Sequence, residues 1–232
     1  MSWVWSHLGE IGDLTLIHMG LAVLPILIGF VLSIPFGYWA SRSRIARSVL
    51  LTLGNILYTI PGIALVVLVP VIAGFAILDP KNVVFALTVY AFAIMVRSAA
   101  DAFAAVPDPV RQSAVALGYS PFQRFLRVEL PLAGPVLLAG VRVVSVSTVS
   151  LVTIGALAGI DNLGNFFVDG YIRSFPTETV VGIVLVLLIA AVFDLVLSGI
   201  GRMLMPWNGR RATGTRRAGV SVPRQGGLEV GA

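Results

Sequence analysis

Five apolar stretches constrain the fold of this chain more than any other feature. They cover residues 20–40, 48–77, 83–96, 130–157 and 179–204. A helix that crosses a bilayer needs about 20 mostly apolar residues, and within lipid a helix is one of the few structures that pairs all its backbone polar groups. Since 57% of the 232 residues are hydrophobic and only 12% are charged, a water-soluble globule is excluded. The pattern predicts an all-α polytopic membrane protein with about five transmembrane helices.

The second stretch, 48–77, is too long for one straight crossing and contains Pro61 and Pro70. Proline removes a backbone donor and kinks a helix, and membranes tolerate this where the freed groups face protein or a water-lined path. We therefore expect one broken helix, or a helix followed by a short second piece. Asn55, Tyr58 and Thr59, just before the break, are candidates for lining a pathway; ordinary hydrogen bonds between helices are the alternative.

Two charged residues lie inside predicted spans. Arg142 lies eleven residues beyond Pro131 and Asp194 eight residues before Arg202, which places them roughly 16 Å and 12 Å from the same end at about 1.5 Å per residue. A lone charge at such depth costs about 2.5–3.5 kcal/mol on insertion scales. We predict that the two pair between the fourth and fifth helices; a role for Asp194 in proton coupling is the alternative.

The span 130–157 is also the richest in hydroxyl groups. Ser145 and Thr148 are candidates for lining a hydrophilic path, and hydrogen bonding between neighbouring helices is the alternative role for them.

The stretch 106–135 is the one long polar interruption between apolar segments. Asp108, followed by proline, predicts a helix start in which the aspartate caps free N–H groups, and Gly118 predicts the end of that helix. Ser120 and Gln123 have capping-box spacing, so a second short helix should run toward residue 129, with the next segment beginning at Pro131. On composition alone, an amphipathic loop on the lipid surface is the alternative.

The order of residues in this stretch resembles the EAA loop of ABC-importer permeases. That pattern is Glu-Ala-Ala, three residues, Gly, nine residues, Ile-x-Leu-Pro. The spacing fits throughout, with Gln112 in place of Glu and Ser113 in place of Ala. Gln lacks the carboxylate but keeps similar hydrogen-bonding capacity. The resemblance implies that an ATPase subunit docks on the loop, through these positions: Gln112, Ser113, Ala114, Leu117, Gly118, Leu130 and Pro131.

From about residue 58 to 202 the chain is similar to permeases for glycine betaine, choline, carnitine and related osmoprotectants. The segments TIPGIALVVLVPVIAGF, RVELPLAGPVLLAGVRVVSV and IGALAGIDNLGNFFVDG carry this resemblance. It implies the type I ABC importer permease fold in a bacterial cell membrane. It also implies a second permease subunit, identical or paralogous, an extracytoplasmic solute-binding protein, and ATP and Mg bound by separate ATPase subunits.

Basic residues predict the orientation. Every Lys and Arg except Lys81, Arg142 and Arg173 falls in a segment that is cytoplasmic if the N-terminus lies outside and the C-terminus inside. This bias accounts for the net charge of +5, so the charge does not indicate that the chain binds nucleic acid. We also expect Arg97 and Asp101, one helical turn apart, to form an ion pair.

The expected division of the chain follows from this orientation. It comprises an outer segment 1–17, a permease domain 18–205 with the coupling loop 106–131, and a basic, disordered tail 206–232. The tail's charges set topology, with binding to anionic lipid as the alternative. Residues 158–177 are expected to form a Gly-rich outer loop.

Motifs for catalysis and metal binding are absent from the sequence. The single lysine follows Pro80, so the chain has no phosphate-binding GxxxxGK[ST] loop and is not the ATPase. It has no cysteine, no GxSxG and no HExxH, and His7 and His18 have no convergent partners. The sequence predicts a transport subunit that is not an enzyme and holds no metal. An ABC permease for another small solute, or a secondary carrier or channel, is the alternative.

Overall fold

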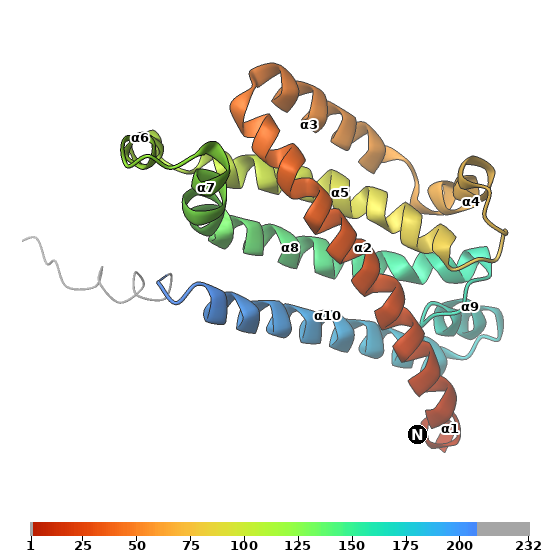
Figure 1. Cartoon of the computed structure of the whole chain (residues 1–232). Helices are drawn as coiled ribbons and strands as arrows, with labels where there is room; N and C mark the ends of the chain where they lie inside the picture. Colours follow the sequence, from red (N-terminus) through yellow and green to blue (C-terminus); the bar gives the residue numbers. More distant parts are fainter. Residues whose placement is uncertain (1, 208–232) are drawn as a thin grey trace, which may run out of the picture.

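The computed structural model describes residues 2–207, which are helical and contain no β-strand (Figure 1). The predicted all-α fold is therefore confirmed. The expected basic tail lies outside the described residues, apart from its first two positions. The elements are α1 (Ser2–Ser6), α2 (Leu8–Arg42), α3 (Arg44–Thr59), α4 (Gly62–Ala73), α5 (Lys81–Ala104), α6 (Asp108–Ala116), α7 (Pro121–Arg124), the π-helix η1 (Phe125–Glu129), α8 (Leu130–Val152), the 3₁₀-helix η2 (Thr153–Ala158), α9 (Asn165–Ile172) and α10 (Pro176–Leu204).

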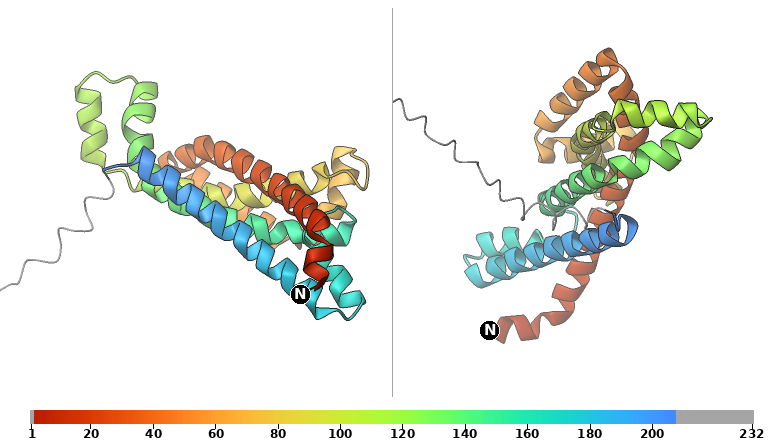
Figure 2. Two further views of the ribbon diagram at one scale, coloured as in Figure 1. Left: turned by 90° about the horizontal axis from the view of Figure 1, so that it is seen from below. Right: turned by 90° about the vertical axis from the view of Figure 1, so that its left-hand side faces the viewer.

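Within the described range, four helical stretches are long and apolar enough to cross a membrane: α2, α5, the continuous run 121–158, and α10. The bent pair α3 and α4 makes a fifth crossing if it is counted as one span. Figure 1 shows α6 and α7 projecting at one end of the bundle, which we call the loop end, while α4 and α9 lie at the opposite end. The C-terminal end of α10 lies at the loop end (Figure 2).

Helix α5 forms the centre of the bundle and packs against α2, α3 and α8. Glycines make the approach of α2 close: a Cβ on Gly29 or Gly37 would overlap Ala91 or Ala99 of α5. Small residues at a helix interface let backbones come together in a membrane, where packing drives association. Helix α10 packs on α8 and α9 at the side of the bundle and is the least buried of the long spans.

The expected break in the second apolar stretch is present. Helices α3 and α4 meet at Pro61 with a bend of 102°. The carbonyl oxygen of Ile60 just before the proline accepts a hydrogen bond from the Tyr90 hydroxyl of α5. A buried partner for a freed carbonyl is what makes such a break tolerable in lipid.

Some expected boundaries agree with the structure and others do not. The start of the next segment is confirmed to within one residue, since α8 begins at Leu130 with Pro131 in its first turn, although α7, η1 and α8 are continuous. The stretch 158–177 is not a loop throughout, since it contains α9. At the other end of the chain, α2 continues across the boundary proposed between residues 17 and 18.

Candidate functional site

The projecting hairpin of α6 and α7 is built by two local motifs. Gly118 ends α6 with φ of +80°, its N–H donates to Val115 O at 2.9 Å, and the Tyr119 N–H donates to Ala114 O at 3.1 Å. This pair of hydrogen bonds is a Schellman motif, which satisfies the last carbonyls of the helix and favours glycine. The expected capping box is also present: Ser120 and Gln123 each accept the other's backbone N–H.

Asp108 does not cap α6, contrary to expectation. It is the first residue of the helix, after Pro107, and makes no capping hydrogen bond. Its carboxylate instead accepts from Arg111 Nη1 at 2.8 Å. An aspartate at this position still interacts favourably with the positive end of the helix dipole.

The residues of the EAA-like pattern divide into two groups. Gln112, Ser113, Leu117 and Gly118 are exposed, and Leu117 has 77% of its surface open. Ala114 is buried against the hairpin's own base, while Leu130 and Pro131 are half-buried in the first turn of α8. The exposed group therefore lies on α6 and the turn that follows it, where Gln112 also lines a cavity beside Arg42.

Glu129 fixes this hairpin to the bundle and was not singled out from the sequence. Its side chain is fully buried, and both carboxylate oxygens accept from Arg42 Nη2 of α2 at 2.6 Å. Arg124 Nε of α7 donates at 2.9 Å, and Arg111 Nε of α6 lies 3.6 Å away. A single carboxylate thus joins α6 and α7 to α2, which lies 87 residues away in sequence. A lone acidic residue at the junction of a basic loop and an apolar span was the available clue.

Aromatic rings pack beside the cluster of Glu129 and its arginines. Tyr38 packs edge-on against Phe103 and Phe125, and its hydroxyl accepts from Arg42 at 3.0 Å. Beside the cluster, a cavity of about 420 Å³ opens between the loop and the end of α2. It is lined by Arg42, Asp108, Arg111, Gln112, Val115, Ala116 and Arg124.

Arg142 and Asp194 are brought together across α8 and α10. Arg142 Nε and Nη2 donate to the two carboxylate oxygens of Asp194 at 2.6 and 2.7 Å. The bidentate geometry matches the planar guanidinium to the carboxylate. The pair is not enclosed, since 42% and 35% of the two side chains are exposed in the chain alone.

The candidate pathway residues lie in different environments. Ser145 and Thr148 are buried inside the bundle, so they do not line an open surface of this chain. Asn55, Tyr58 and Thr59 are exposed on α3, and Asn55 accepts from Arg97 at 3.2 Å. The expected pair of Arg97 with Asp101 is therefore wrong; Asp101 pairs with Arg47 of α3 instead. Arg97 and Asp101 each contact a side chain of α3 rather than each other, although they lie one helical turn apart.

His18 is fully buried, and its Nε2 donates to the carbonyl oxygen of Val149 at 3.0 Å. Because the chain tightens into the 3₁₀-helix η2 at Thr153, the backbone N–H there bonds to Ser150 and leaves the Val149 carbonyl free. A structural role accounts for this histidine. Among residues 2–207 no group of His, Asp and Glu is arranged to hold a metal ion.

Comparison with known proteins gives consistent results. The family model described as "Binding-protein-dependent transport system inner membrane component" matches residues 29–209. The osmoprotectant import permease protein OsmW of Salmonella typhimurium is 26% identical over 88% of this chain and 96% of its own length. The glycine betaine/carnitine/choline transport system permease protein OpuCD of Bacillus subtilis is 27% identical over 82% of both chains. An inward-facing structure of the MetNI methionine ABC transporter aligns with a TM-score of 0.68 and 26% identity, over 83% of this chain and 94% of that one.

Proposed function

Because the chain belongs to the family of binding-protein-dependent transport system inner membrane components, we propose that it is the permease subunit of an ATP-driven importer for osmoprotectants. The relatives that carry this substrate class are named for glycine betaine, choline and carnitine, and they match nearly the whole chain. Like them, the chain is an inner-membrane permease. Glycine betaine, choline or a similar quaternary ammonium compound is the solute.

The partners follow from the same family. Two permease subunits form the pathway, separate ATPase subunits bind ATP and Mg and dock on the coupling loop, and a binding protein delivers the solute from outside. Closure of the ATPases moves α6 and α7, and this movement switches the pathway between its inward-facing and outward-facing states.

The contacts of Glu129 with Arg42, Arg111 and Arg124, which we call the Glu129 clamp, are the observation that best supports this mechanism. A docking hairpin transmits motion only if it is attached rigidly to the spanning helices. Glu129 holds arginines from α2, α6 and α7 at once, and it lies directly at the start of α8. A displacement of α6 therefore acts on two spanning helices, α2 and α8, together.

Replacement of Gly118 tests the proposal, with Gly74 as a matched control. Both glycines have left-handed backbone angles, φ of +80° and +71°, and at both a new Cβ would meet nothing within 4 Å. Gly118→Asp and Gly74→Asp therefore impose similar strain, about 1–2 kcal/mol. Only Gly118 lies on the exposed surface of the coupling loop, so only its substitution should disturb a docked ATPase.

The measurement is uptake of labelled glycine betaine after osmotic upshift, in cells that lack other uptake routes and express the chain with its ATPase and binding protein. We expect Gly118→Asp to abolish uptake and copurification of the ATPase at unchanged membrane levels, while Gly74→Asp keeps both. Competition of unlabelled choline and carnitine with the labelled glycine betaine ranks the three solutes by affinity. Normal uptake by Gly118→Asp would refute docking at this loop; ATPase binding without uptake of any of these solutes would instead refute the substrate class and favour another small solute.

A further inference from the structure

Polar residues form a stripe along α10 on the side next to α8, and this stripe is not covered by other parts of the chain. Asp194, Ser198 and Arg202 follow one another at intervals of four residues, so they lie on one side of the helix. Across from them, α8 presents Arg142 and Ser147, neither of which is buried. We call these five residues the α8–α10 seam.

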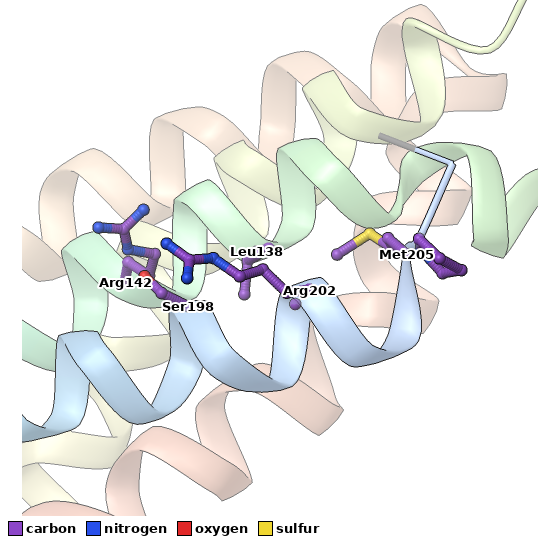
Figure 3. Close-up of a pocket in the computed structure, with 7 residues that line it drawn as sticks. Leu138, Arg142, Ser198, Arg202 and Met205 are labelled. Carbon is purple, nitrogen blue, oxygen red and sulfur yellow. The ribbon is translucent and has the colours of Figure 1, made fainter. Parts of the chain in front are cut away.

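Two cavities open along the seam and share Arg142. The first, of about 360 Å³, is lined at the loop end by Arg142, Ser198 and Arg202 among others, and Figure 3 shows both arginines reaching into the same space beside Ser198. The second, of about 450 Å³, lies deeper and is lined by Arg142, Ser147 and Asp194 with three apolar neighbours. The polar surface therefore continues from the loop end to the ion pair in the middle of the span.

This surface is unsuited to lipid. Charged side chains inside spanning segments face the interior of a bundle or a water-filled cavity, because hydrocarbon does not solvate them. Asp194 and Arg142 are nevertheless about two-fifths exposed in this chain. By contrast, the open side of α2 at comparable depth is purely apolar and includes Leu24, Leu27 and Val31. The two sides of the chain thus present opposite chemistry at the same level of the membrane.

We propose that the α8–α10 seam faces the aqueous solute pathway and that the Arg142–Asp194 pair contacts a zwitterionic solute there. This inference rests on the proposed function, since glycine betaine carries a quaternary ammonium and a carboxylate on one small molecule. Asp194 faces the ammonium and Arg142 the carboxylate. A solute with both charges can replace, for each side chain, the counter-charge that the other residue supplies in this structure, whereas a simple cation or anion can replace only one of them.

The absence of cysteine from the chain permits a direct test. Single variants Ser147→Cys and Ser198→Cys are assembled with the ATPase in nanodiscs and reacted with a charged, membrane-impermeant maleimide; Val31→Cys on the apolar side of α2 is the control. A thiol must ionise in water to react. We expect both seam cysteines to react at least about tenfold faster than the control, equivalent to about 1.4 kcal/mol. Equal rates would show that the seam is covered by lipid or a tight protein interface and would overturn the proposal.

Protection of Ser147→Cys identifies the solute class. Glycine betaine is compared with tetramethylammonium and with acetate, which carry its two charges separately. Because joining two weak contacts in one molecule raises affinity, glycine betaine should protect at a concentration about tenfold lower than either probe, again about 1.4 kcal/mol. Equal protection by one probe, or no protection by any, would overturn the contact with a zwitterion. Labelling does not depend on transport, so it tests the seam separately from the proposed function. Rapid labelling and protection without uptake of these solutes by cells would refute the osmoprotectant importer but not the water-facing position of the seam.

Discussion

At the scale of single residues, Glu129 illustrates how one buried charge can organise a membrane protein's surface loop. A carboxylate removed from water is costly unless it is paired and hydrogen-bonded. Here Arg42 and Arg124 donate to it directly, and Arg111 lies close. The positive charges of Arg111 and Arg124 in the loop are thereby directed inward, toward Glu129.

Glu129→Gln should destabilise the protein by about 3 kcal/mol, the low end for removing one partner of a buried ion pair, because Arg42 keeps a third of its side chain exposed. Unfolding titrations in mixed micelles measure the change. Asp108→Asn is the control, since this carboxylate is paired with the same Arg111 but is 77% exposed, and a surface pair contributes about 0–1 kcal/mol. Equal effects of the two substitutions would contradict a clamp at Glu129.

The Arg142–Asp194 pair leads to a double-mutant prediction. Asp194→Asn leaves the Arg142 guanidinium without its carboxylate partner and should lower the free energy of unfolding. Arg142→Gln added to it removes that charge and should recover most of the loss. The same unfolding titration provides the measurement, and a double variant no more stable than the single would show that the two residues do not interact.

At the scale of elements, the close approach of α2 and α5 depends on glycine. Alanine normally favours a helix over glycine by about 1 kcal/mol. At Gly12, where a Cβ meets nothing within 4 Å, Gly12→Ala should therefore be neutral or stabilising. At Gly37 the new methyl group would overlap the backbone of Ala99, so Gly37→Ala should cost about 1–3 kcal/mol. Opposite signs in unfolding measurements on one helix are the expected result; a stabilising Gly37→Ala would refute the close packing.

The hairpin of α6 and α7 shows what local sequence specifies at this scale. Gly118 and the Ser120–Gln123 capping box act on residues within a few positions, so the turn between α6 and α7 could be predicted. The continuity of α7, η1 and α8 could not be predicted in this way. A proline in the first turn of a helix lacks only an N–H that is often unpaired there, and η1 carries the chain smoothly into α8.

At the scale of the whole molecule, the orientation in the membrane remains a prediction. If the N-terminus lies outside, the loop end lies in the cytoplasm and the turn before α5 lies outside. Leu78→Cys in that turn should react with an impermeant maleimide on intact cells, and Ala105→Cys at the loop end should react only after the membrane is opened. Both positions are exposed in the structure. The reverse pattern would invert the assignment of every cytoplasmic segment.

The sequence by itself determined the helical class, the break at Pro61 and the turn at Gly118. All of these depend on the bilayer's thickness or on neighbours within one or two turns. Only the tertiary structure decided that Asp101 pairs with Arg47 and that Ser147, rather than Ser145, lies on the open side of α8. It also decided that Glu129 holds α2 and the loop together. These contacts depend on how each helix is rotated about its axis, which is set by packing against other helices and not by the apolar pattern of its own residues.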